Sequence, residues 1–215
     1  YRANPMAASG RPTYFIKTYW NQDTPFNNLC PKINGSAAPT GCIATAMAQI
    51  MKYYQYPATS KGTGIYSVTT YKDKNDKEGT TKWYKRELGH TYQWTAMQSS
   101  YGILSDDEND AVATLMADAG AASQMNYQTN SSGTIEWYAA KGFAENFRYD
   151  SLAISCLQRD FYTDAEWMEL VRKEMEAKQP VLYCGSDEID GGHAFLLAGI
   201  QEDGKVHVNW GWGKS

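Results

Sequence analysis

Two side chains that lie far apart in this sequence are of the types and in the surroundings that covalent catalysis uses. Cys42 directly follows Gly41 and begins the apolar run CIATAMAQIMKYY. His193 directly follows two glycines and begins the apolar stretch HAFLLAGI. A thiolate becomes an effective nucleophile when an imidazole takes its proton. The pair therefore predicts acyl-transfer chemistry if the fold brings Cys42 and His193 together.

The segment around Cys42 carries the signals of a helix start. Pro39, Thr40 and Gly41 precede the apolar run, and Pro57 ends it. Apolar side chains recur along the run with the spacing of one helix face. Cys42 is thereby expected in the first turn, where unpaired N–H groups and the helix dipole favour an anion. A small buried cysteine at the start of a core helix is the alternative interpretation.

The segment after His193 offers groups that could orient its imidazole. Asp203 and Gly204 form a strong hairpin signal, and the returning run VHVNWGW carries Asn209 and Trp210. Asn209 could hydrogen-bond to the imidazole, and Trp210 could shield it from water. A shift of one residue in strand register exchanges the two, so both remain candidates.

Acyl transfer also needs donors aimed at the developing oxyanion. The backbone N–H of Cys42 can supply one. Gln22, in the sequence WNQ, is the candidate for a side-chain amide donor. The alternative is that Gln22 is a surface loop residue.

The composition excludes several classes of function. The chain has 215 residues, 42% of them hydrophobic, and a net charge of −4 with its basic residues scattered. No basic stripe suits nucleic acid and no apolar run is long enough to span a membrane. The histidines are dispersed, so no metal site is expected. Cys156 and Cys184 are expected to be packing residues.

The order of expected elements indicates an α+β fold. Helices are predicted over 42–54, 106–120, 135–147 and 164–178, and apolar strands over 180–185, 193–200 and 205–212. The charged run 72–79 is expected to be a solvated hairpin tip. The chain thus divides into a helical part followed by antiparallel strands.

Three blocks together, GCIATAMAQIMKYY, GGHAFLLAGI and HVNWGWG, resemble the streptopain family of papain-like bacterial cysteine peptidases. The likeness extends from about Asn21 to Trp212. It implies one papain-like catalytic domain over 1–215 with a cleft between two lobes. The helical lobe would be mostly 36–150, and the sheet lobe mostly 151–215 with the N-terminal segment. The family continues beyond GWGG, so the C-terminal strand region is expected to be missing and the chain to be the mature region.

The resemblance also implies roles for individual residues. Cys42 would be the nucleophile, His193 the general base and Gln22 the oxyanion glutamine. Papain relatives place an orienting asparagine at Asn209, whereas streptopain-like enzymes are described as using the tryptophan at Trp210. Further positions that resemble substrate-binding ones are Ser131, Ser132, Gly133 and Gly192.

The function implied is that of a secreted cysteine endopeptidase that hydrolyses host or nutrient proteins through a thioester intermediate. Its partners would be protein or peptide substrates and an N-terminal propeptide that inhibits the zymogen, without nucleic acid or membrane. A reduced thiol suffices, and no cofactor or metal is implied. Two alternatives stay open: a transglutaminase- or amidase-type acyl transferase, and an inert binding module on a papain-like shell.

Overall fold

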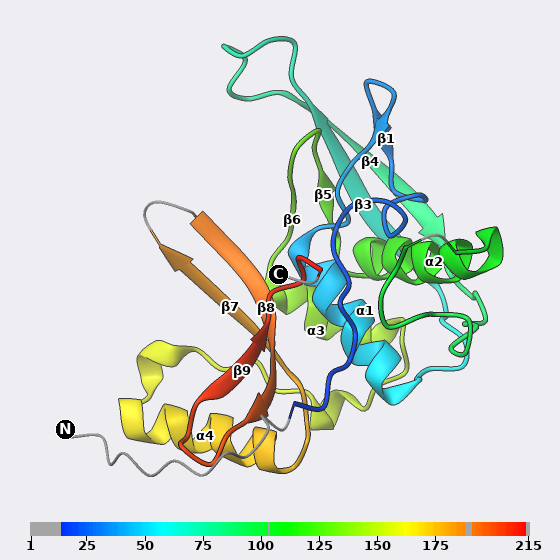
Figure 1. Ribbon diagram of the computed structural model, residues 1–215. Coiled ribbons are helices and arrows are strands. Elements are labelled where there is room, and N and C mark those ends of the chain that lie inside the picture. The colour runs from blue at the N-terminus through cyan, green and yellow to red at the C-terminus, as the bar shows by residue number, and fades with distance from the viewer. Residues whose placement is uncertain (1–13, 103, 188–190, 214–215) are drawn as a thin grey trace.

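The computed structural model describes residues 14–102, 104–187 and 191–213 (Figure 1). The described helices are α1 (Cys42–Tyr54), α2 (Asp106–Ala122), α3 (Glu136–Glu145) and α4 (Asp164–Glu176). The strands are β1 (Lys32–Ile33), β2 (Ser36–Ala37), β3 (Thr63–Thr70), β4 (Thr80–Glu87), β5 (Asn126–Tyr127), β6 (Ser132–Gly133), β7 (Val181–Asp187), β8 (Gly191–Ile200) and β9 (Val206–Asn209). Short 3-10 helices cover Ser151–Ala153 and Arg159–Phe161.

Two of the predicted helices, α2 and α4, begin directly after residues that cap them. Ser105 and Glu108 form a capping box at the start of α2, and Thr163 and Glu166 form another at the start of α4. In each box the hydroxyl accepts a backbone N–H while the glutamate accepts one from the cap residue. Helix α1 ends at Gln55, which adopts the left-handed conformation two residues before Pro57.

Helix α1 is more central than its pattern predicts. An amphipathic helix with one apolar face was expected, but every residue from Ile43 to Met51 is buried. The helix contacts α2 and α3 on one side and β8 on the other. In Figure 1 it lies between the sheet formed by β7, β8 and β9 and the sheet that contains β3 and β4. A helix enclosed on all sides needs small residues where neighbours approach closely, which explains its alanines.

The strands β7, β8 and β9 form an antiparallel sheet in that order. One face of β8 presents Ala194 and Leu196 to the core that contains α1. Its other face presents Leu197, which packs with Val171 and Met175 of α4. The sheet is therefore held between the two helices, with α4 on its outer side (Figure 1).

A second sheet, ordered β4-β3-β5-β6, lies on the other side of α1. Its long β3–β4 hairpin ends in the solvated tip that the charge run 72–79 predicts. The strands themselves were not identified from the sequence. Almost every residue of β4 is exposed, so the strand lacks the alternation of apolar and polar side chains that marks a half-buried strand.

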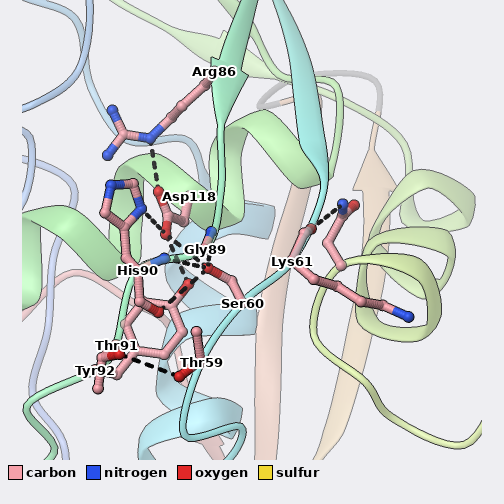
Figure 2. Close-up of polar contacts among 10 residues, drawn as sticks. Thr59, Ser60, Lys61, Arg86, Gly89, His90, Thr91, Tyr92 and Asp118 are labelled. Carbon is pink, nitrogen blue, oxygen red and sulfur yellow. Dashed lines mark hydrogen bonds and ion pairs between the residues drawn. The ribbon is translucent and has the colours of Figure 1, made fainter.

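The buried carboxylate of Asp118 links α2 to β4 and to the loops beside it (Figure 2). Asp118 of α2 is fully buried, and its oxygens accept hydrogen bonds from Arg86 Nε at 2.7 Å and Tyr92 Oη at 2.8 Å. His90 Nδ1 lies 2.9 Å from the same carboxylate, and Ser60 Oγ donates to it at 3.4 Å. The charge of Asp118 is thus compensated by several partners, as a buried charge requires.

Replacing Asp118 by alanine is expected to lower the free energy of unfolding by about 3–5 kcal/mol, because the positive charge of Arg86 would lose its buried partner. Urea unfolding monitored by circular dichroism measures the loss. Glu169→Ala is the matched control, since it removes an exposed ion pair with Arg172 and should leave the midpoint nearly unchanged. Equal midpoints for Asp118→Ala and Glu169→Ala would contradict the prediction.

Candidate active site

Cys42 is the first residue of α1, and the backbone before it depends on glycine. Gly41 has φ +88°, and a Cβ there would lie 2.6 Å from Sδ of Met125. No side chain caps the helix, and its first turn holds no acidic residue. Thr45 Oγ1 instead donates to the carbonyl oxygen of Gly41. The positive end of the α1 dipole is therefore not offset by a carboxylate where the thiol of Cys42 stands.

His193 lies on β8, and one hydrogen bond indicates the tautomer of its imidazole. Its Nε2 is 2.8 Å from the backbone carbonyl oxygen of Trp210. A carbonyl oxygen only accepts hydrogen bonds, so Nε2 carries the proton in this pair. Nδ1 of His193 is left as the nitrogen that can take a proton from another group and give it back.

Aromatic rings surround the imidazole of His193. The ring of Trp212 is centred 4.7 Å away, and those of Trp210 and Phe195 are each 6.2 Å away. Trp210 and Trp212 stack on one another at 5.7 Å. The rings pack beside the imidazole and limit its rotation, while Trp210 and Trp212 themselves remain exposed to solvent.

The loop that follows β9 connects His193 to the helix of Cys42. Gly211 has φ +72°, and a Cβ there would lie 3.3 Å from Cγ2 of Thr45. Thr45 stands one turn along α1 from Cys42, and Gly211 directly follows the residue whose carbonyl binds His193. Figure 1 shows this loop, in red, beside the beginning of α1. The structure thus places the loop that supports His193 close to the first turns of the helix that Cys42 begins.

Asn209 and Trp210, the two candidates for orienting His193, have different partners in the structure. Asn209 pairs with Leu196, and its side chain donates to Thr18 O at 2.8 Å and to Gln49 Oε1 at 3.0 Å. Its own oxygen accepts from the backbone N–H of Gly211 at 3.0 Å. The hydrogen bond to the imidazole comes instead from Trp210, through its backbone carbonyl and not through its indole N–H. The catalytic role of either residue remains a prediction.

The candidate oxyanion residue lies near the start of α1. The carbonyl oxygen of Gln22 accepts from the backbone N–H of Thr40 at 3.0 Å. Two residues earlier, the carbonyl oxygen of Trp20 accepts from the N–H of Gly213 at 3.2 Å. The segment 20–22 is thus fixed both to the residues before Cys42 and to the loop after β9. Gln22 is half-buried there, and its role as an oxyanion donor remains a prediction.

The predicted substrate-binding residues stand at two borders of this region. Ser132 and Gly133 form β6, and a Cβ at Gly41 would lie 3.1 Å from the carbonyl oxygen of Ser132. Ser131 immediately precedes that strand. Gly192 lies on β8 beside His193 and has no atom closer than 4.0 Å to the position of a Cβ. Open space at Gly192 is compatible with the approach of a substrate backbone.

The four cysteines are all unbridged. Cys30 is buried, and burial raises the pKa of its thiol to about 12. The expectation that Cys156 and Cys184 are packing residues is wrong, because both are exposed. Cys184 is on β7, at the edge of its sheet, and Cys156 lies between the two 3-10 helices. Partial desolvation, followed by the charge of Glu136, still raises the pKa of Cys184 to about 12.

Two residues near the site were not identified from the sequence. Gln49 is a buried polar residue on α1, and Trp212 stacks closest to His193. A signal for Gln49 was present, because it is an amide inside a largely apolar helical run and stands two turns from Cys42. Trp212 gave no separate signal within the motif NWGW.

Within the described parts of the chain, no three His, Cys, Asp or Glu side chains are placed to hold a metal ion. Among the helices described, none combines the length and the apolar character needed to cross a membrane.

Comparisons with known proteins place this geometry in a family. The model of the Peptidase C10 family matches residues 20–215. The thiol protease/hemagglutinin PrtT of Porphyromonas gingivalis is 35% identical over 196 residues, which are 90% of this chain and 22% of PrtT. Streptopain of Streptococcus pyogenes is 32% identical over 206 residues, which are 91% of this chain and 51% of streptopain. The chain thus spans about half or less of these curated relatives.

Solved structures agree with the sequence comparison. Active wild-type interpain A, a cysteine protease of Prevotella intermedia, superimposes with a TM-score of 0.80 at 34% identity, over 94% of this chain and 82% of that one. A prointerpain A fragment from the same organism gives a TM-score of 0.78 at 34% identity, over 94% of this chain and 62% of the fragment. The predicted α+β, papain-like fold and the resemblance to streptopain are confirmed. The chain belongs to the Peptidase C10 family.

Proposed function

We propose that the protein is a cysteine endopeptidase in which Cys42 is the nucleophile and His193 the general base. One observation carries the proposal: the carbonyl of Trp210 holds Nε2 of His193, and the next residue, Gly211, lies so close to the helix that Cys42 begins that a Cβ there would be 3.3 Å from Thr45. This arrangement leaves Nδ1 as the proton-transferring nitrogen. Family membership supports the same chemistry, since the matched relatives include a thiol protease and a cysteine protease.

The first half of the reaction forms a thioester. The sulfur of Cys42 attacks the scissile carbonyl carbon after its proton has passed to His193. The backbone N–H of Cys42 and the amide of Gln22 stabilise the negative charge that develops on the carbonyl oxygen. The imidazolium of His193 then protonates the leaving amine as the C–N bond breaks.

The second half reverses the proton movements. His193 accepts a proton from water, whose oxygen attacks the thioester carbonyl, and the sulfur of Cys42 leaves and is protonated again. The hydrogen bond from Nε2 to Trp210 holds the ring in one orientation in both halves, so that Nδ1 keeps its place toward the reacting groups. The substrate backbone would extend past Ser131, Ser132 and Gly133 on one side and Gly192 on the other.

The natural substrates in this proposal are proteins or peptides of a host or a nutrient source, and the enzyme is secreted. An N-terminal propeptide keeps the zymogen inactive. The solved prointerpain A fragment supports the existence of a pro-form in a relative with this fold.

Selective alkylation of Cys42 tests the proposal. After gentle reduction, iodoacetamide at pH 6 is expected to label Cys42 far ahead of the other cysteines, as measured by peptide mass mapping. An unperturbed thiol is under about 1% ionised at pH 6. Burial raises the pKa of Cys30 to about 12, and desolvation raises the pKa of Cys156. These thiols serve as internal controls. Labelling of Cys42 no faster than Cys156 would contradict the proposal.

Product analysis separates peptide hydrolysis from the other reactions that a Cys–His pair can perform. New peptide termini after incubation with casein are the expected result. Ammonia release without new termini would indicate a transglutaminase- or amidase-type acyl transferase. Neither product, together with an unreactive Cys42, would indicate a binding module.

A further inference from the structure

We propose that Gln49 is a positioning residue of this enzyme, which acts on His193 through Asn209 and the loop after β9. The inference rests on the proposed function and adds a residue that neither the motifs nor the family match assigns.

Gln49 occupies an unusual place for an amide. It is 1% exposed, in the middle of a helix whose other buried side chains, apart from that of Thr45, are apolar. It follows Cys42 by seven residues, so the two lie on the same face of α1, two turns apart. Thr45, which faces Gly211 so closely that a Cβ there would lie 3.3 Å from Cγ2 of Thr45, lies between them on that face. One side of α1 therefore carries the proposed nucleophile, the residue that faces the loop and a buried amide.

The amide of Gln49 is paired with the amide of Asn209. Gln49 Oε1 accepts from Asn209 Nδ2 at 3.0 Å, and Gln49 Nε2 donates to Asn209 Oδ1 at 3.4 Å. Oε1 also accepts from Thr18 Oγ1 at 2.7 Å. Asn209 Nδ2 donates in addition to the carbonyl oxygen of Thr18 at 2.8 Å. Two opposed hydrogen bonds fix the plane of the Asn209 amide as well as its position.

The fixed amide of Asn209 then sets the backbone that supports His193. Asn209 Oδ1 accepts the N–H of Gly211 at 3.0 Å. That N–H belongs to the peptide group whose carbonyl is that of Trp210, the acceptor of His193 Nε2. The Asn209 side chain therefore holds one end of this peptide unit, and the imidazole contacts the other. A rotation of the Asn209 amide would tilt the carbonyl away from the imidazole.

A matched pair of variants tests the inference. Gln49→Met keeps a long side chain and a good helix former but removes both hydrogen bonds to Asn209. Thr18→Val removes the other side chain bound to Gln49 Oε1 and leaves the amide pair intact. Each variant deletes a buried hydrogen bond, so both should lose stability to urea. Only Gln49→Met should disturb His193.

The measured quantity is the ratio of the Cys42 alkylation rates at pH 6 and pH 9. At pH 9 an ordinary thiol is mostly ionised without a neighbouring base. The ratio therefore measures how far His193 promotes ionisation of the Cys42 thiol at pH 6, independently of how accessible that thiol is. For Gln49→Met the ratio and kcat should fall roughly 10- to 100-fold, the effect of a misplacement of about 1 Å, with KM within about threefold. Thr18→Val should keep the wild-type ratio.

A double-mutant cycle tests whether Gln49 acts on His193 through Asn209. If Gln49 acts through Asn209, Gln49→Met combined with Asn209→Ala should lower the ratio no further than the larger single effect. Effects that multiply would overturn the inference, and so would an unchanged ratio in Gln49→Met or an equal fall in Thr18→Val. If Gln49→Met does not fold, Gln49→Asn retains a buried amide too short to reach Asn209 and should show the same fall. A wild-type protein that shows no selective labelling at pH 6 would overturn the proposed function as well.

Discussion

Cys42→Ala is expected to abolish peptide hydrolysis, with kcat/KM lower by at least about four orders of magnitude, while the protein keeps its fold. Removal of a catalytic nucleophile has effects of this size because the covalent route is lost entirely. The fold should persist because alanine is a good helix former and Cys42 is only partly buried. Initial rates on casein and the urea unfolding midpoint measure the two properties.

The control for Cys42→Ala is Cys156→Ala, which removes an exposed thiol from a segment between 3-10 helices. Its activity should stay within about threefold of wild type, as is usual for a surface substitution. Residual hydrolysis by Cys42→Ala within about tenfold of wild type would show that the nucleophile is another residue. Loss of both activity and the unfolding transition would instead show that Cys42 is structural.

His193→Ala is expected to lower kcat by about three orders of magnitude or more. In the proposed reaction the imidazole acts in both halves, first as base and acid for the thioester and then as base for water. Alkylation of Cys42 at pH 6 should slow as well, since the thiol loses the group that takes its proton. The alkylation rate at pH 9 should change little, which shows that the thiol remains accessible.

His207→Gln provides the comparison for His193→Ala within the same sheet. His207 lies on β9 and stacks on Tyr14 at 4.5 Å, and burial followed by the charge of Lys17 lowers its pKa. Its replacement should leave kcat and the alkylation ratio at wild-type values. An unchanged alkylation rate at pH 6 in His193→Ala would overturn the assignment of the base.

The parts of the fold that local chemistry determines were predictable from the sequence. Capping boxes at Ser105 and Thr163 mark the starts of α2 and α4 because a hydroxyl and a glutamate satisfy free N–H groups at that spacing. The β3–β4 hairpin was visible only at its charged tip. The exposed strand β4 takes its form from pairing with β3, and such pairing leaves no local pattern.

The identities of the residues at the candidate site could be predicted from the sequence, but their arrangement in space could not. The motifs indicated Cys42 and His193, and the hairpin indicated Asn209 and Trp210. The register between β8 and β9 shifts at an irregularity between Leu197 and Gly199, and a shift of this kind changes which side chain faces a given neighbour. The support of His193 comes from a backbone carbonyl, which every residue possesses and no sequence pattern reveals.

The contacts of Asn209 also determine when, during synthesis, the surroundings of His193 can assemble. They join β9 to Thr18 and Gln49, which lie 191 and 160 residues earlier. A ribosome delivers the N-terminal part first, so the helix of Cys42 can form while the strand of His193 and the carbonyl of Trp210 are still untranslated. Cys42 is therefore translated long before the residues that support His193. The candidate site can assemble only after β9 and the loop that follows it have been synthesised, so no earlier nascent chain holds the carbonyl of Trp210 against the imidazole.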